Sequence, residues 1–417
     1  MTVRHPARAR RSLIGRAALG LIFMLVVCVP LARAAVPPVP DKDPFYAVPD
    51  GIADLPNGTV LDSRQITAYS GLLKMPATAW QVKYKTLDSQ GRPTATVTTV
   101  LVPNSPWTGK GPRPLVSYQV AEDGVGSKCS ASYGLSAGLQ LGSQAVTGNA
   151  ALETVLMRLA LQRGWAVAAP DYEGPRSEFL GADMEARGVL DGIRAAIGFQ
   201  PAGVSDEAPI AMWGYSGGAL ASTLAAQLQP SYAPDVKLAG IVLGGAVGDL
   251  KSSLAAFDKL GLGGASVIGL IGLSRAHPDL HLEQYLNAAG QRAIVASQSD
   301  CLADALLRYP GRTSASFSLP GFLDGPVLTK LLRESSPLGR PGTPSAPVYD
   351  YHAGQDELAP IGPDRELMAR YCADGVAVQH VEFPGEHLSE VAVGAPGALA
   401  YIADRFAGLP APSNCSG

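Results

Sequence analysis

Gly214-Tyr215-Ser216-Gly217-Gly218 lies between an apolar run at residues 210–213 and a helical pattern at residues 219–228. The stretch predicts a strand, a sharp turn and a helix, with glycine two residues before and two residues after the serine, where strand and helix must approach closely. In such a turn the Ser216 hydroxyl stands exposed above the sheet, and the helix N-terminus directs backbone N–H groups to the place where an oxyanion forms. A flexible glycine-rich turn is the alternative for the pentapeptide alone, but its two flanks favour a nucleophile.

Short apolar segments alternate with helical patterns from residue 114 onward. Strands are predicted at residues 115–118, 165–169, 210–213, 238–243, 348–352 and 377–383. Further helices are predicted at residues 151–163, 184–198, 364–373 and 396–407. Because these strands are apolar on both faces, they predict an α/β fold with a mostly parallel central sheet that is flanked by helices. Residues 79–102 precede them and alternate between apolar and polar positions, which predicts an antiparallel hairpin.

The alternation of strands and helices stops between residues 249 and 344, where stretches rich in glycine, alanine and leucine predict helices. We therefore expect an inserted helical cap or lid at residues 249–344 and a core made of residues 35–248 and 345–417. A membrane-inserting helix is the alternative for residues 260–273. Its many small residues and the charged residues at both flanks favour a buried segment or one that lines a substrate pocket.

The first residues have the features of an export signal. Five arginines among residues 4–16 precede an apolar run at residues 17–31, and Ala32-Arg33-Ala34 fits an A-x-A cleavage site. The run is shorter than the ~20 apolar residues that span a bilayer, so residues 1–34 predict a signal peptide and no transmembrane anchor after its removal. The pair Arg10-Arg11 gives the signal a bacterial, twin-arginine-like appearance. The export route therefore stays open between the general secretory route and the twin-arginine route. The mature protein is expected to be secreted, with the periplasm or the cell envelope as alternatives.

The composition indicates a globular protein with a large core, because 47% of the 417 residues are hydrophobic and 17% are charged. The formal net charge of −3 provides no basic field, which argues against nucleic acid as a partner.

The cysteines predict disulfides rather than a metal site. Cys28 would leave with the signal peptide, and an even number then remains in an exported chain. The four that remain are expected to form two disulfides, and the sequence leaves all three possible pairings open: Cys129, Cys301, Cys372 and Cys415. His277 and His281 have a spacing that suits metal ligation on a helix, but Pro278 lies between them and no third ligand is evident. We therefore expect neither a metal ion nor a cofactor.

An acid and a histidine follow Ser216 in the chain order of an α/β-hydrolase triad. Asp356 lies directly after an apolar strand, and His387 lies past the last strand. His387 would accept the proton of the Ser216 hydroxyl, and Asp356 would fix the imidazole tautomer. The adjacent Glu357 is the alternative acid. One oxyanion donor should be the backbone N–H of Gly217, and the loop at residues 119–124 should supply the other, although it has no HGGG-type motif.

Five blocks of sequence in this order resemble the secretory lipase family over nearly all of the mature chain. They are Ser117-Tyr118-Gln119 leading to Asp123 and Cys129, then residues 168–175, 214–219, 354–356 and 384–387. The resemblance implies an α/β-hydrolase with a helical cap that acts on acylglycerols and other carboxylic esters without a cofactor.

The resemblance also assigns roles to individual residues. Ser216, Asp356 and His387 would form the triad, and Asp123 with Gly217 would supply the oxyanion hole through backbone N–H groups. It further implies disulfides that pair Cys129 with Cys301 and Cys372 with Cys415.

The expected function is a secreted serine carboxylester hydrolase, most consistent with a lipase that makes transient contact with a lipid interface. An acyltransferase or broad esterase with the same triad is an alternative, because the two differ only in the access of water to the acyl-enzyme. A non-catalytic cell-surface binding protein is the alternative from another class, and an intact Ser, Asp and His in order argues against it.

Overall fold

The structure is a computed structural model that describes residues 36–139 and 148–415. The predicted signal peptide at residues 1–34 lies outside the described residues. The strands of the main sheet are β1 Val60–Ile66, β4 Ala77–Leu87, β5 Pro93–Pro103, β6 Leu115–Gln119, β7 Ala166–Pro170, β8 Ile210–Tyr215, β9 Leu238–Gly244, β10 Val348–Ala353 and β11 Val378–Phe383. Two further short strands, β2 Tyr69–Ser70 and β3 Leu73–Lys74, pair with each other.

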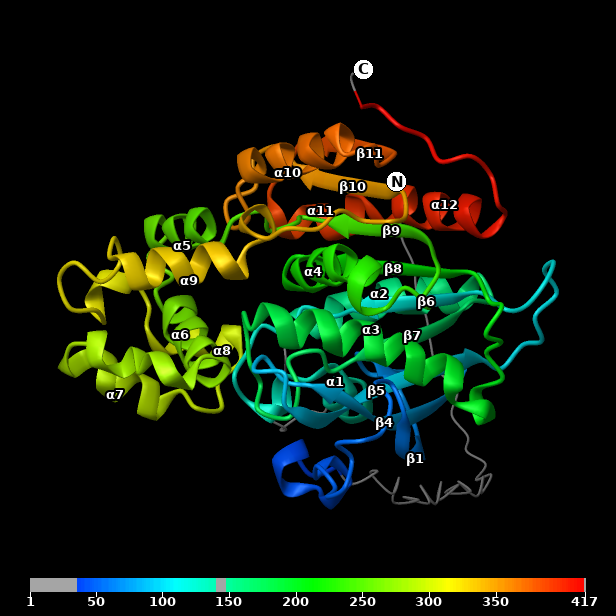
Figure 1. The fold of residues 1–417 in the computed structure, drawn as a ribbon, viewed down its shortest axis with the longest axis horizontal. Coiled ribbons are helices and arrows are strands. Elements are labelled where there is room, and N and C mark those ends of the chain that lie inside the picture. The colour runs from blue at the N-terminus through cyan, green and yellow to red at the C-terminus, as the bar shows by residue number, and fades with distance from the viewer. Residues whose placement is uncertain (1–35, 140–147, 416–417) are drawn as a thin grey trace, which may run out of the picture. The chain divides into compact units, whose positions relative to one another are not determined.

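The main sheet has the order β1-β4-β5-β7-β6-β8-β9-β10-β11 within the described residues (Figure 1). The strands from β7 to β11 along this order run parallel, whereas β1, β4 and β5 pair antiparallel. Each strand predicted from the sequence coincides with an observed strand, and the predicted hairpin is the pair β4 and β5. The predicted α/β class with a mostly parallel sheet is therefore confirmed.

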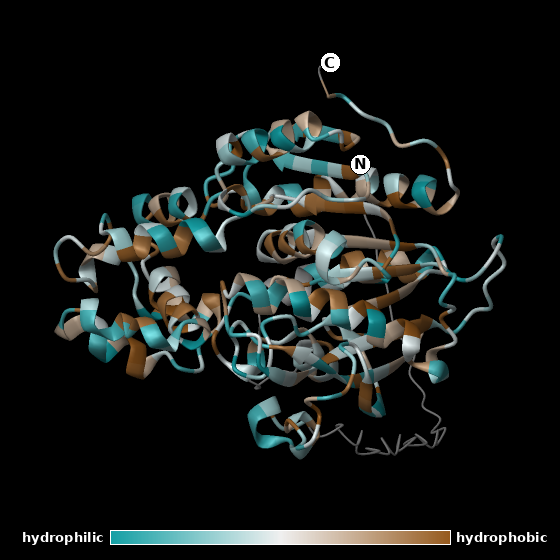
Figure 2. Cartoon of the chain, viewed as in Figure 1, coloured by the Kyte–Doolittle hydropathy of each residue, from teal (hydrophilic) through white to brown (hydrophobic). Residues whose placement is uncertain are grey.

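Helices cover both faces of the sheet. Neighbouring residues of a strand point to opposite faces, and because both sets are apolar in the central strands, both faces need a covering layer. Leu115 packs with α3 (Ala182–Gly198), α4 (Gly217–Tyr232) and α10 (Ile361–Ala373). The next residue, Val116, packs on the other face with α1 (Ala131–Ala137), α2 (Gly148–Gln162) and α12 (Ala395–Phe406). Figure 2 shows the same arrangement, with largely hydrophobic central strands and helices that carry both hydrophobic and hydrophilic residues. The core thus has one layer on each side of the sheet.

The segment between β9 and β10 is helical in the structure. It contains α5 Leu250–Lys259, α6 Gly264–Ala276, α7 Ala288–Ala296, α8 Leu302–Arg308 and α9 Pro326–Ser335. These helices lie beyond the carboxyl ends of β9 and β10 (Figure 1). Leucines of the segment, such as Leu273 and Leu331, share a hydrophobic cluster with Leu220 and Leu224 of α4. We propose residues 249–344 as the extent of the cap because the segment packs on the helix that follows Ser216.

The apolar residues 260–273 fall largely within α6. Most of its hydrophobic side chains are buried among the other cap helices and the loop around Phe179 and Leu180. Within the described part of the chain, no helix is both long enough and apolar enough to cross a membrane.

Two disulfides join distant parts of the chain. Cys129, beside α1, pairs with Cys301 at the start of α8, and Cys372 of α10 pairs with Cys415 in the C-terminal tail. This is the pairing that the family resemblance implies. The first bridge ties the loop that contains Asp123 to the cap, where the Leu302 backbone N–H also donates to the Asp123 carbonyl at 2.8 Å.

Candidate active site

Ser216 lies at the sharp turn between β8 and α4. Its backbone adopts φ = 54°, a left-handed conformation that is unusual for a residue with a side chain and is typical of strained functional turns. The flanking glycines allow the turn, because a Cβ on Gly214 would lie 2.2 Å from the Gly218 carbonyl oxygen and one on Gly218 would lie 1.9 Å from the Gln119 carbonyl oxygen. The predicted strand, turn and helix around Ser216 are thus present.

His387 begins α11 (His387–Val393), and its imidazole lies between Ser216 and Asp356. Its Nε2 is 2.8 Å from the Ser216 Oγ, and its Nδ1 is 2.6 Å from the Asp356 Oδ2. The other carboxylate oxygen of Asp356 accepts backbone N–H bonds from Leu358 at 2.9 Å and from Ala359 at 2.6 Å. Three segments that are distant in sequence therefore bring a hydroxyl, an imidazole and a carboxylate into one hydrogen-bonded row.

The neighbouring Glu357 occupies a different place. Its carboxylate accepts the backbone N–H of His387 at 3.0 Å, whereas the imidazole faces Asp356. Burial alone would raise the pKa of Asp356, but hydrogen bonds from His352 and His387 outweigh it and hold that pKa well below its ordinary value. Asp356 therefore stays ionised, which is what an acid that orients a histidine requires.

Asp123 and Gly217, the two residues predicted to supply the oxyanion hole, lie near Ser216 in the structure. Asp123 also has a left-handed backbone, with φ = 37°. A Cβ on Gly217 would lie 2.0 Å from the Asp123 Oδ1, so only glycine lets the Asp123 carboxyl pack over the start of α4. Both residues line the same cavity as Ser216 and His387.

The cavity has a volume of about 310 Å³ and is mostly apolar. Cap leucines form much of its wall, among them Leu254, Leu262, Leu270, Leu306, Leu328 and Leu332. Ser216, His387 and Asp123 also line it and supply its hydroxyl, imidazole and carboxyl groups, while the cap adds a few serines. A cavity with an apolar wall and a small group of convergent polar side chains is typical of a small-molecule site.

Glu153 of α2 is a buried acid at this cavity that the sequence analysis did not identify. It accepts the backbone N–H of Ala121 at 3.0 Å and the hydroxyl hydrogen of Tyr118 at 3.0 Å. Burial raises the pKa of Glu153 to about 8. Helical periodicity could have indicated that Glu153 is buried, because Leu156, Met157 and Ala160 follow it at spacings that place all four on one face of the helix.

His352 of β10 lies behind Asp356 and was also not assigned a role from sequence. It is fully buried, and its Nε2 is 2.8 Å from the Ala359 carbonyl oxygen and 3.4 Å from the Asp356 Oδ2. Burial alone would lower the pKa of His352, but the carboxylates of Asp356, Asp364 and Asp350 raise it to about 11. His281, by contrast, is exposed in the cap and 3.6 Å from Glu283.

The parallel sheet, the serine at a left-handed turn before a helix, and the row of imidazole and carboxylate define an α/β-hydrolase. The model of the secretory lipase family matches residues 139–414. The chain belongs to the secretory lipase family, and this membership supports a lipase or esterase type of ester hydrolase.

Two relatives and one solved structure illustrate the similarity. A probable inactive lipase of Mycobacterium tuberculosis is 36% identical over 387 residues, which are 91% of this chain and 85% of the relative. Lipase 4 of Candida albicans is 34% identical over 415 residues, covering 95% of this chain and 87% of the relative. The crystal structure of Candida antarctica lipase A is similar with a TM-score of 0.84 and 31% identity, covering 91% of this chain and 89% of that one.

Proposed function

We propose that this protein is a secreted serine carboxylester hydrolase that cleaves triacylglycerols and other lipid esters through an acyl-enzyme. The observation that carries the proposal is the His387 imidazole, which is 2.8 Å from the Ser216 hydroxyl and 2.6 Å from the Asp356 carboxylate, where Ser216 and His387 line a mostly apolar cavity. Ser216 is the nucleophile, His387 the general base and acid, and Asp356 the group that orients the imidazole.

The reaction follows from these positions. His387 Nε2 accepts the hydroxyl proton as Ser216 Oγ attacks the ester carbonyl carbon, and the carbonyl oxygen becomes an oxyanion. The backbone N–H groups of Gly217 and Asp123 stabilise that oxyanion. The tetrahedral intermediate collapses, His387 gives its proton to the leaving alcohol, and the acyl group stays on Ser216. Water then attacks the acyl-enzyme by the same steps and releases the fatty acid.

The wall of the cavity supports a lipid substrate. Leucines from α5, α6, α8 and α9 offer apolar contact to an acyl chain and no partner for a charged group. Leu388, next to His387, is 58% exposed and lines the same cavity, so it could contact a lipid interface when substrate enters.

The test compares esters of increasing acyl length on the purified mature chain, with nitrophenyl and glyceryl esters as substrates and Ser216→Ala as the control. We expect hydrolysis that Ser216→Ala abolishes and a preference for chains longer than acetate. No hydrolysis of any ester would contradict the proposal. Adding an alcohol to the assay measures the acyltransferase alternative as the ester-to-acid product ratio.

A non-catalytic protein on this fold is the second candidate, because one relative is described as a probable inactive lipase. A fluorophosphonate probe separates the two, since it labels a serine only when a base activates it. Labelling of the wild type but not of Ser216→Ala or His387→Ala supports an enzyme. Equal absence of label in all three supports the non-catalytic candidate.

We further propose that export removes residues 1–34, so that the mature chain begins near Ala35. Membership in a family described as secretory supports export. N-terminal sequencing of protein recovered from the medium, the periplasm and the cell envelope would locate the mature form. Material that still contains residues before Leu31 would contradict the cleavage.

A further inference from the structure

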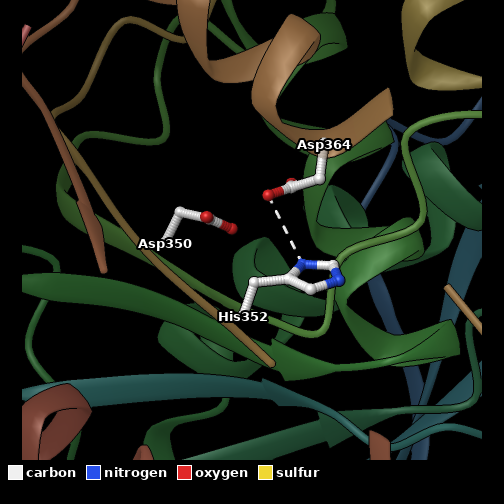
Figure 3. A group of neighbouring side chains, drawn as sticks. All are labelled: Asp350, His352 and Asp364. Atoms are coloured by element: carbon white, nitrogen blue, oxygen red, sulfur yellow. Dashed lines mark ion pairs between the residues drawn. The ribbon is translucent and has the colours of Figure 1, made fainter. Parts of the chain in front are cut away.

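Asp350, His352 and Asp364 form a cluster beneath the loop that carries Asp356 (Figure 3). Asp350 and His352 are two residues apart on β10 and so point to the same face, where Asp364 approaches from the first turn of α10. All three side chains are fully buried, and one potential ligand atom from each lies within 4.8 Å of the others. Figure 3 shows their polar ends directed toward a common space.

Polar atoms of this cluster lack hydrogen-bond partners among the described residues. They are both carboxylate oxygens of Asp364, the Oδ1 of Asp350 and the Nδ1 of His352. An unpartnered buried polar atom costs roughly 1–3 kcal/mol, and more when it carries charge, so native proteins rarely keep several together. Two of these atoms, His352 Nδ1 and Asp364 Oδ2, lie 3.4 Å apart as an ion pair, drawn as a dashed line in Figure 3. The Oδ1 atoms of Asp350 and Asp364 have neither a hydrogen bond nor an ion pair, and two buried carboxylate oxygens left in this way indicate a group that binds between the three side chains.

The far ends of two of these side chains are held by hydrogen bonds. His352 Nε2 lies 2.8 Å from the Ala359 carbonyl oxygen, so it donates its N–H there, and Nδ1 is the ring nitrogen that faces the cluster; a cation bound there would take the place of a proton on Nδ1. The Oδ2 of Asp350 accepts from His380 Nδ1 at 2.5 Å, which leaves Oδ1 directed elsewhere. This outer arrangement, with an imidazole N–H on a backbone carbonyl and a carboxylate held by a second donor, is the one that orients metal ligands.

We propose that Asp350, His352 and Asp364 bind a divalent cation, and that the cation is Zn²⁺. One imidazole nitrogen with carboxylate oxygens is a donor set that zinc accepts. Bonds of 2.0–2.2 Å in a tetrahedron separate neighbouring ligand atoms by roughly 3.4 Å. The distance from His352 Nδ1 to Asp364 Oδ2 is 3.4 Å, so this edge of the site already has the required length.

His380 also borders the cluster, with its Nδ1 3.7 Å from the Asp364 Oδ2. The His380 side chain is 19% exposed, so the cluster lies one residue away from solvent. The cation would be structural, because it would link β10 to α10 and support the Asp356 loop from behind without touching Ser216. This proposal differs from the expectation of no metal that the sequence alone gave.

The competing account is a protonated His352 that neutralises the acids without a metal. An imidazolium would have to donate Nδ1–H to Asp364 across 3.4 Å, which is longer than the ~2.7–2.9 Å of a charge-assisted hydrogen bond. It would also leave the Oδ1 atoms of Asp350 and Asp364 without partners.

The experiment measures the metal content of the purified mature protein and its response to Zn²⁺ alone. We expect one zinc per chain, its loss on dialysis against a chelator, and a Tm that rises by about 3 °C when Zn²⁺ is restored at 100 times its Kd. Co²⁺ in place of zinc should give the visible absorption of a tetrahedral site. Asp364→Asn should lose all of these responses, and the matched control Glu366→Gln, an exposed acid on the same helix, should keep them.

The outcomes separate the accounts. Absence of bound metal together with no Tm change on adding Zn²⁺ would overturn the proposal and favour the imidazolium. Zinc that Asp364→Asn binds as well as the wild type does would also overturn it. The wild-type measurements decide the matter even when Asp364→Asn fails to fold. None of these readouts uses ester hydrolysis, so this proposal and the proposed function can fail independently.

Discussion

Replacing Asp356 with asparagine should reverse the hydrogen-bond polarity of the proposed triad without changing its shape. The Oδ1 of Asp356 accepts N–H bonds from Leu358 and Ala359, so the amide oxygen of asparagine must occupy that place. The amide NH₂ then takes the place of Oδ2, 2.6 Å from His387 Nδ1. Two donors cannot share that contact, so His387 would adopt the tautomer with its proton on Nε2. That nitrogen then donates to Ser216 and can no longer accept its proton.

The magnitude follows from the loss of the base. A triad with the wrong histidine tautomer loses a factor on the order of 10⁴ in kcat, which corresponds to about 5 kcal/mol of transition-state stabilisation. KM should change little, because the apolar wall that binds the acyl chain is untouched. The matched control is Glu357→Gln, which alters a contact to the His387 backbone N–H and should cost less than about tenfold.

The assay is steady-state hydrolysis of a nitrophenyl ester by the three proteins, with thermal unfolding as a check on folding. An Asp356→Asn enzyme that keeps more than a tenth of the wild-type kcat while Glu357→Gln loses activity would show that the acid was assigned one residue too early. Loss of activity in neither variant would refute the triad as the source of catalysis.

Three further predictions concern the turn, the cap and the buried acid. Gly218→Ala should abolish ester hydrolysis and lower Tm, because its Cβ would lie 1.9 Å from the Gln119 carbonyl oxygen; wild-type kinetics would contradict the argument. Leu270→Trp should narrow the cavity and reduce hydrolysis of long acyl esters while acetate esters are spared, whereas an equal loss on all lengths would mean that the residue is only core. The pKa of Glu153 is raised by burial to about 8, so its contribution to stability is full below pH ~4.5 and is lost as the pH rises through 8. The free energy of unfolding in urea should therefore depend less on pH between 5 and 9 in Glu153→Gln than in the wild type. The same pH dependence in both proteins would contradict this role of Glu153.

Much of the fold could be predicted because the central strands are apolar on both faces and the turn at Ser216 needs glycine at fixed places. β1 was not predicted, since Val60–Ile66 carries polar residues through most of its length and lies at the edge of the sheet. Edge strands receive little burial, so hydrophobic periodicity carries little information about them.

The candidate site could be predicted only in part, because local sequence patterns do not say which side chains meet after folding. Chain order and the strand ends indicated Ser216, an acid and His387, but only the family resemblance favoured Asp356 over Glu357, since both follow the same strand. Only the folded loop directs one carboxylate to the imidazole and the other to a backbone N–H. The groups that converge on His352 come from β10, the loop after it and α10, so their meeting depends on tertiary packing that local patterns do not encode.

The bridge between Cys129 and Cys301 closes a covalent ring that contains Ser216 and excludes Asp356 and His387. A protease that cuts the cap between these cysteines would leave both fragments joined, and the nick would be visible only on a reducing gel. The proposed base therefore lies outside the segment that this disulfide encloses, and it reaches Ser216 only when the carboxyl-terminal part of the chain packs on the sheet.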